Sequence, residues 1–408
     1  MSRVSEILAE LVRIPSENTP PVGAEAGCQA WIADFLRELG LDAEVYRLAE
    51  VEGLEQHPLY WPGRDYSARP NVFARLRGSG GGQSLILSGH IDTVPVGGAS
   101  WTHPPFGATE SGGRMYGRGV WDMKAGVASA LAVIERLRRE SITLRGDLLF
   151  ESVVDEEFGG VNGTLAGRVR GCLADAAILG EPSKLRVTPA QRGGRIFHVT
   201  FRSAGDIFAN DHGPTAVEQL SRFLNTLPGF QAMRLERAPR SDFYLQANPV
   251  PVFVTNIQTS QWGSSEPIAI PSQCRLEIYY ETMPGETQQE IEAQFFEWLD
   301  SISSDRHVFP SPPEVTRPIR FLPASFTPRD HPFIKHFSAC ASRVLGSPPP
   351  VEGIEAPCDM YVFHQFGMPA LLWGPNGGNA HLPDEYTDLD SLDQSTEVLY
   401  EFAKSWCG

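Results

Sequence analysis

The stretch SLILSGHIDTVP, at residues 84–95, sets the fold class of this chain because an apolar run of strand character ends directly at a histidine. Similar apolar runs follow at residues 148–154 (LLFESVV) and 176–180 (AAILG). Residues 123–140, which lie between the first run and the second, show helical periodicity. Strands that alternate with helices favour a mostly parallel sheet covered by helices on both faces. The sequence therefore predicts an α/β fold.

The pattern changes in the middle of the chain. From residue 190 to residue 320 the expected order is strand, helix, strand, strand, helix, strand, which is typical of a ferredoxin-like α+β domain. A helical stretch at residues 331–346 and an apolar run at 369–374 (PALLWG) then return to the first pattern. We therefore expect a large domain formed by residues 1–189 and 321–408, with a smaller α+β domain of residues 190–320 inserted into it.

Polar residues of metal-binding type stand where the apolar runs of the large domain end. They are His90 and Asp92, then Asp155, Glu156 and Glu157, then Glu181, and His381 in the glycine-rich loop after PALLWG. In an open α/β sheet the ligand crevice lies beyond the carboxyl ends of the strands, so we expect these residues to meet. Taken singly, each has a plain structural explanation; Asp122, just before a helix, would make a good N-cap. Several such coincidences at one sheet edge favour a functional site.

The chemistry of this set suits divalent metal ions. Two imidazoles and three carboxylates match what zinc, cobalt or manganese accept, and they are offered by His90, Asp122, Glu157, Glu181 and His381. One carboxylate with two oxygens can bridge two metals that lie roughly 3.5–4 Å apart. Of two adjacent glutamates, one can bind metal while the other takes a proton from water. We therefore predict a two-metal site.

Composition limits the partners. The chain has 408 residues, 41% of them hydrophobic, and a formal net charge of −16, which argues against a nucleic-acid partner. No apolar run reaches the roughly 18 residues that span a membrane, and the first residues lack the pattern of a signal peptide. The six cysteines form no CxxC pair, which favours reduced thiols in a cytoplasmic protein. We therefore expect neither a nucleic-acid partner nor a membrane, and the resemblance described next implies a small-molecule substrate.

Five motifs, in this order, carry a family resemblance: SGHIDTVP, GRGVWDMKAG, DEEFGG, LGEP and NAHLPDEY. With them the chain resembles the di-zinc aminoacylase and carboxypeptidase family of metallopeptidases. That family includes acetylornithine deacetylase, succinyl-diaminopimelate desuccinylase, glutamate carboxypeptidase and the aminoacylases. The resemblance covers nearly the whole chain and implies two Zn²⁺ ions per chain, with Co²⁺ or Mn²⁺ as alternatives.

The resemblance also implies a role for each metal-type residue. Asp122 would bridge the two metals. His90 and Glu181 would complete one site, and Glu157 and His381 the other. The inserted domain would act as a lid and often as a dimerisation surface, so a homodimer is possible.

Two further residues take catalytic roles by the same resemblance. Asp92 would hydrogen-bond His90 and fix its tautomer. Glu156 would be the general base, and then the acid that protonates the leaving amine. A cis peptide bond is implied between Asp122 and Met123. Asp359, at a helix start, matches a family aspartate, but it could be only an N-cap and stays outside the catalytic set.

The lid departs from the family pattern at two positions. Ala209 stands where a histidine that polarises the scissile carbonyl is usual, and His212 could replace it or be only a solvated residue. Glu281 stands where an arginine is usual. A negative charge there would repel a substrate carboxylate, unless Glu281 points to solvent and Arg192 or Arg195 binds the carboxylate.

Three functional interpretations follow. The first, which we favour, is a metal-dependent hydrolase of an amide bond in an N-acyl amino acid, a small peptide or a related compound. The second is an acyl-transfer or amide-forming enzyme on the same scaffold. The third is a non-catalytic, metal-stabilised binding protein. Retention of Glu156 argues against the third, because a purely structural metal site needs no free base.

Overall fold

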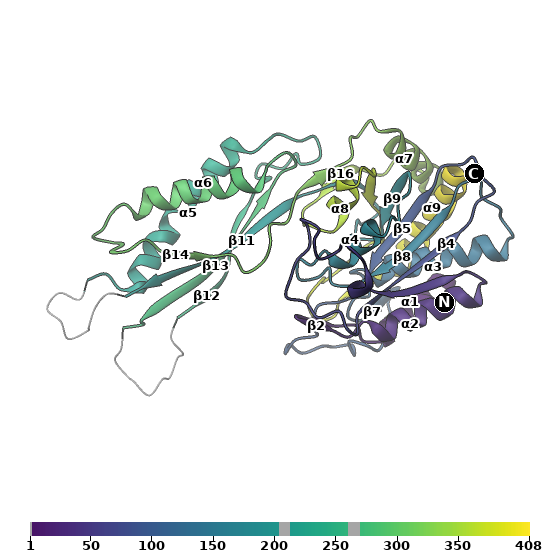
Figure 1. Cartoon of the computed structure of the whole chain (residues 1–408), viewed down its shortest axis with the longest axis horizontal. Coiled ribbons are helices and arrows are strands. Elements are labelled where there is room, and N and C mark those ends of the chain that lie inside the picture. Colours follow the sequence, from purple (N-terminus) through teal and green to yellow (C-terminus); the bar gives the residue numbers. More distant parts are fainter. Residues whose placement is uncertain (1, 204–212, 260–269) are drawn as a thin grey trace. The chain divides into compact units, whose positions relative to one another are not determined.

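The computed structural model describes residues 2–203, 213–259 and 270–408. Two compact units are present. The larger unit contains Met1–Ala190, Phe326–Ile354 and Cys358–Gly408, and the smaller unit contains Gln191–Ser325 and Glu355–Pro357. Figure 1 shows the elements of each unit. None of the helices in the described residues is long and apolar enough to cross a membrane.

A nine-stranded sheet forms the centre of the larger unit. Its four middle strands are parallel to one another, in the spatial order β17 (Ala370–Leu372), β9 (Ala176–Leu179), β5 (Leu85–His90) and β8 (Leu148–Val153). Antiparallel strands flank them: β4 (Pro70–Leu76) and β3 (Ala43–Arg47) beyond β8, and β10 (Val187–Gln191) beyond β17. Two short strands complete the β10 side, β15 (Ser325–Phe326) and β16 (Val351–Ile354). The predicted α/β class, with a mostly parallel core, is confirmed.

Both faces of this sheet are buried, because alternate residues of each strand enter different clusters. Leu85 and Leu87 join the cluster that contains the apolar faces of α1 (Arg3–Arg13), α2 (Ala26–Glu38), α3 (Lys124–Arg139), α4 (Asn162–Val169), α7 (Pro332–Leu345) and α9 (Leu389–Cys407). Ile86 joins a second cluster with α8 (Met360–Gln365). This period-two alternation is what a strand covered on both sides requires.

Short strands brace the loops around the sheet. A four-stranded sheet has the order β18 (Gly377–Gly378), β19 (Tyr386–Asp388), β7 (Arg114–Tyr116) and β6 (Thr109–Ser111). Another pair joins β1 (Asn18–Thr19) to β2 (Val22–Gly23), and a 3-10 turn, η1, spans Leu48–Glu50. The β19–β7 pairing brings the glycine-rich loop beside the segment that precedes α3.

The smaller unit has the strand and helix order that the sequence predicts. Along the chain it contains β11 (Gly193–Arg202), α5 (Ala216–Arg237), β12 (Val252–Gln258), β13 (Gln273–Thr282), α6 (Gln288–Ser303) and β14 (Glu314–Thr316). The antiparallel sheet has the order β12-β13-β11-β14, which is the split arrangement of a ferredoxin-like domain. Phe197, Phe223 and Phe295 are fully buried in its aromatic core.

Candidate metal centre

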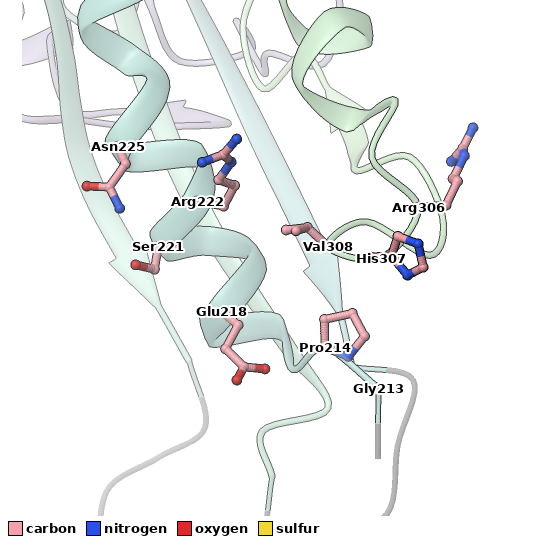
Figure 2. A pocket seen from close by; sticks show the side chains of 9 residues that line it. All are labelled: Gly213, Pro214, Glu218, Ser221, Arg222, Asn225, Arg306, His307 and Val308. Atoms are coloured by element: carbon pink, nitrogen blue, oxygen red, sulfur yellow. The ribbon is translucent and has the colours of Figure 1, made fainter. Parts of the chain in front are cut away.

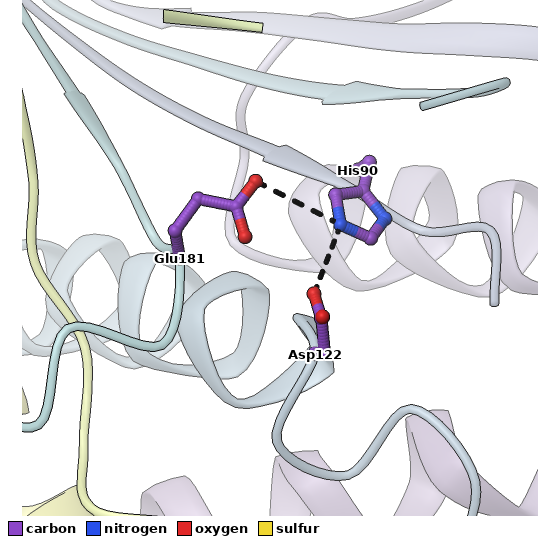
Figure 3. Close-up of side chains that lie close together, drawn as sticks. All are labelled: His90, Asp122 and Glu181. Atoms are coloured by element: carbon purple, nitrogen blue, oxygen red, sulfur yellow. Dashed lines mark ion pairs between the residues drawn. The ribbon is translucent and has the colours of Figure 1, made fainter. Parts of the chain in front are cut away.

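Three of the predicted metal ligands meet beyond the carboxyl ends of β5 and β9. Figure 3 shows His90, Asp122 and Glu181 pointing toward one another. His90 Nε2 lies 3.3 Å from Asp122 Oδ1 and 3.8 Å from Glu181 Oε1. His90 is the last residue of β5, Glu181 follows β9, and Asp122 lies in the turn before α3.

A second group forms on the other oxygen of Asp122. His381 Nε2 lies 3.4 Å from Asp122 Oδ2 and 2.9 Å from Glu157 Oε2. The two groups thus share Asp122, with one carboxylate oxygen directed to each histidine. The five residues named from the sequence as metal ligands all lie in these two groups.

Close backbone packing brings the turn before α3 to the end of β9. A Cβ atom added at Gly126, in the first turn of α3, would overlap the carbonyl oxygen of Gly180, the residue before Glu181. Only glycine permits this approach of two backbones. The contact therefore helps to set the separation between Asp122 and Glu181. The peptide bond between Asp122 and Met123 is cis, as the resemblance implies.

The donor atoms fit divalent ions. Tetrahedral zinc with bonds of about 2.0–2.1 Å places its ligand atoms roughly 3.3 Å apart. The four distances above, from 2.9 to 3.8 Å, bracket that value. Within the residues that the structure describes, no lysine or arginine forms an ion pair with Asp122, Glu157 or Glu181.

The charges of the centre are also those of a cation site. Burial raises the pKa of Glu181 to about 8 and that of Glu157 to about 7, because a buried carboxylate loses its hydration. Hydrogen bonds to Asp122 and Glu157 raise the pKa of His381 to about 10. Buried acids without a cation are costly, and bound metal ions would supply the missing positive charge.

Asp92 contacts His90 differently from the predicted arrangement. The main-chain oxygen of Asp92 lies 3.0 Å from His90 Nδ1, whereas the nearer carboxylate oxygen is 3.7 Å away, beyond hydrogen-bond distance. The carboxylate instead accepts hydrogen bonds from the backbone N–H groups of Glu156, at 3.0 and 3.2 Å, and of Glu157, at 3.1 Å. The side chain therefore anchors the loop that carries both glutamates, because the backbone oxygen already satisfies the imidazole.

Glu156 lies beside the first group, and among the described residues it forms no ion pair with a lysine or an arginine. Its Oε2 is 4.0 Å from His90 Nε2, and its side chain is 16% exposed. Burial raises the pKa of the Glu156 carboxyl well above its usual range. The carboxylate is thus held near the two groups with some access to solvent.

Glu281, in the smaller unit, is buried and ion-paired with Arg192. The Arg192 guanidinium also lies over the ring of Tyr244, 4.9 Å from its centroid. Glu281 therefore does not point to solvent, and its pairing with Arg192 reduces the charge that would repel a substrate carboxylate, while the repulsion itself stays a prediction. Arg195 is engaged by Glu292 at 3.0 Å. Ala209 and His212 lie outside the described residues.

Asp359 and the hollow in Figure 2 lie outside the two donor groups. Asp359 is the N-cap residue of α8, yet its carboxylate accepts a hydrogen bond from Thr164 Oγ1 at 2.5 Å and makes no capping bond. The hollow, in the smaller unit, is lined by α5 and the segment after α6, with Arg222, Arg306 and His307 on its surface. It contains none of the residues predicted as metal ligands.

Sequence reasoning missed Glu385, which is 1% exposed and accepts four hydrogen bonds from the turn that ends at Asp122. The signal was present in the NAHLPDEY motif, where an acidic residue follows His381 by four positions. Its partners, however, lie about 265 residues earlier in the chain. No local pattern connects the two segments.

Comparisons with known proteins agree with this geometry. The model of peptidase family M20/M25/M40 matches residues 86–405. The N-formyl-4-amino-5-aminomethyl-2-methylpyrimidine deformylase of Bacillus subtilis is 27% identical over 95% of this chain and 91% of its own length. The succinyl-diaminopimelate desuccinylase of Hydrogenovibrio crunogenus is 26% identical over 98% of this chain and 97% of its own length.

Solved structures show the same fold. The M20 family metallo-carboxypeptidase Sso-CP2 from Sulfolobus solfataricus has a TM-score of 0.76 and 16% identity, with coverage of 100% of this chain and 99% of that chain. Human carnosine dipeptidase 1 has a TM-score of 0.77 and 17% identity, with coverage of 99% and 96%. Because the family model matches well over half of the chain, the protein belongs to peptidase family M20/M25/M40, the metal-dependent hydrolases of amide and peptide bonds.

Proposed function

We propose that the chain removes an acyl group from the nitrogen of a small molecule by hydrolysis of the amide bond, with two divalent ions, preferably Zn²⁺, at the metal centre. One observation carries this proposal: the two oxygens of Asp122 face two different histidines, each of which has a second carboxylate beside it. A single structural ion needs neither a shared carboxylate nor two such groups.

Five side chains would hold the ions: His90 and Glu181 on one side, His381 and Glu157 on the other, and Asp122 between them. Two bound ions supply Lewis acidity, which polarises the scissile carbonyl and makes water more acidic. The chain itself would orient the substrate and move the proton.

Glu156 is the residue that we assign to proton transfer. Its Oε2 would accept the proton from the attacking water and then deliver it to the leaving nitrogen, so that the amide is split into a carboxylic acid and an amine. The Asp92 carboxylate holds the backbone of Glu156 in place through the N–H bonds described above. Asp92 thus acts as a positioning residue for Glu156 and not as a proton carrier.

The names of the relatives support N-acyl amines as the substrate class. The two described above are named as a deformylase and a desuccinylase, and an acetylornithine deacetylase of Klebsiella pneumoniae is 25% identical over 98% of this chain. Each name describes the release of a small acyl group from an amine. N-formyl and N-acyl amines therefore come before dipeptides in the proposed substrate range.

A substrate panel tests the proposal. The purified protein, supplied with Zn²⁺, Co²⁺ or Mn²⁺ in separate samples, is incubated with matched N-formyl, N-acetyl and N-succinyl amines and with dipeptides, and the released amine is measured. We expect two ions per chain and acyl release from at least one N-acyl amine. Release of amine only from dipeptides contradicts the acyl assignment. Two bound ions with no turnover on any member, and transfer of the acyl group to an added amine, would instead favour acyl transfer.

A further inference from the structure

The turn that carries Asp122 is organised by one buried carboxylate outside the metal centre. Glu385 Oε2 accepts hydrogen bonds from the Arg118 guanidinium at 2.8 Å and from the Gly119 N–H at 2.9 Å. Its Oε1 accepts from the backbone N–H groups of Trp121, at 3.0 Å, and Asp122, at 3.1 Å. Each carboxylate oxygen of Glu385 thus accepts two hydrogen bonds, and all four donors belong to residues 118–122.

The segment around Glu385 is tied to residues 116–117 by its main chain and to residues 102–103 by the Asp384 carboxylate. The Glu385 carbonyl oxygen accepts a hydrogen bond from the Gly117 N–H at 3.0 Å. The next residue, Tyr386, pairs with Tyr116 in the β19–β7 ladder. The preceding residue, Asp384, accepts hydrogen bonds from the backbone N–H groups of Thr102 and His103, both at 2.9 Å.

His381 belongs to this same segment, four residues before Glu385. The loop from His381 to Glu385 is sharply folded, with positive φ angles of 63° at His381 and 54° at Asp384. Glu385 therefore joins the segment that carries His381 to the turn that carries Asp122, the carboxylate that both groups share. Within the described residues, the His381 imidazole also reaches this turn, at 3.4 Å from Asp122 Oδ2, and Glu385 adds four hydrogen bonds to that link.

We infer that Glu385 is a positioning residue that fixes Asp122 relative to His381 and so makes the two metal sites share one carboxylate; the inference rests on the proposed two-metal function. A carboxylate is suited to this task because it only accepts hydrogen bonds, and four donors point at it. Donor placement in a metal site is sensitive to the groups that support the ligands.

The isosteric variant Glu385→Gln exposes the role. A glutamine amide would turn an N–H group toward backbone N–H groups that are themselves donors, so at least one bond is lost and two donors confront each other. The matched control is Glu151→Gln. Glu151 is also 1% exposed, and its carboxylate binds the Arg168 guanidinium at 2.5 and 2.8 Å and Ser88 Oγ at 2.8 Å, and none of these partners is an expected metal ligand.

The experiment compares metal retention in the wild type, E385Q and E151Q. Each full-length protein is loaded with Co²⁺, its visible absorption spectrum is recorded, and the ions are withdrawn by titration with a chelator. We expect both variants to unfold at a lower temperature. Only E385Q should change the Co²⁺ spectrum and lose one ion at a chelator concentration at least about tenfold lower, a difference of about 1.4 kcal/mol.

Each outcome decides the question. An E385Q protein with the wild-type spectrum and wild-type retention overturns the inference, and so does equal loss of ions in E385Q and E151Q, because that loss would follow from lower stability alone. A wild type that binds no ion overturns the proposed function itself. If E385Q does not fold, Glu385→Asp, which keeps the charge but shortens the reach, is judged by the same spectrum and the same tenfold criterion.

Discussion

Buried carboxylates of the metal centre and of the smaller unit have different partners. In the smaller unit, Arg234, which is fully buried, pairs with Glu286 at 2.6 Å, and Glu281 and Glu292 likewise face arginines. In the metal centre, the ion pairs of Asp122, Glu157 and Glu181 within the described part of the chain are all with histidines. An arginine beside a buried acid is a permanent cation, whereas a histidine can give up its proton and bind a metal ion through the freed nitrogen. The difference separates internal structural pairs from a site that attracts metal ions.

Asp122→Ala tests this comparison in the metal centre, and we expect it to have the largest effect of the variants proposed. Both donor groups lose their shared oxygens, so we expect metal analysis to fall from two ions per chain to near zero, with loss of turnover. Asp42→Ala, at an exposed position, is the control and should retain both ions. Loss of only one ion from the Asp122 variant would mean that the carboxylate is not shared.

Arg234→Met tests the same comparison in the smaller unit, because it removes the arginine partner of Glu286. Removal of one partner leaves the Glu286 charge buried and unpaired, which costs about 3–5 kcal/mol of the free energy of unfolding. Denaturant unfolding measures the change, and metal content should stay at the wild-type value. Arg222→Met, an exposed position on the same helix, serves as the control. A stability close to that of the wild type would show that the ion pair contributes little.

Glu156→Gln sharpens the comparison within the metal centre. The change removes the proton acceptor but none of the five expected ligands, so ion content should be unchanged while kcat falls at least about a hundredfold. Metal analysis and turnover on the best N-acyl substrate are measured on the same sample. Glu38→Gln, exposed on α2, is the matched control. Wild-type turnover in the Glu156 variant would assign proton transfer to another group.

His364 gives the smallest expected effect and a contrast among histidines. It is partly buried and forms no ion pair with a carboxylate among the described residues, and burial lowers its pKa to about 4, whereas carboxylates raise the pKa of His381. Because its folded pKa lies below the usual 6.5, the stabilisation is complete above pH 6.5 and is lost as the pH falls toward 4. We expect the metal-free protein to lose roughly 1–3 kcal/mol of unfolding free energy through this group over that range.

The measurement is the pH dependence of unfolding in the wild type and His364→Gln. The variant should show a shallower decline between pH 6.5 and pH 4, while His336→Gln, at a more exposed histidine, should follow the wild-type curve more closely. Identical slopes in wild type and His364→Gln would show that His364 does not carry the acid sensitivity.

The sequence predicted those parts of the site that depend on strand ends. His90 and Glu181 could be placed together because each follows an apolar run, and parallel strands bring such ends to one edge. That inference needs only the periodicity of single elements, which is written locally in the chain. The role of Asp122 followed instead from the resemblance of the motif GRGVWDMKAG to a known family.

Other contacts depend on distances that a single segment does not encode. Arg192 neutralises Glu281 because β11 and β13 are antiparallel in a register that sets Gly194 opposite Glu281. The sequence shows both charges but not that register. The Asp92 carboxylate likewise binds the Glu156 backbone and not His90, since its local geometry directs only its main-chain oxygen toward the imidazole.

The contact between Gly126 and Gly180 shows that one added carbon atom would be enough to distort the metal centre. A single methyl group at Gly126 would occupy the volume of the Gly180 carbonyl oxygen. Alanine, the smallest possible enlargement, would therefore push α3 from β9 and carry Asp122 away from Glu181, although neither ligand is altered. The distance of closest approach between the two backbones thus sets the dimensions of this centre. We therefore expect Gly126, which touches no metal, to tolerate substitution as poorly as a metal ligand does.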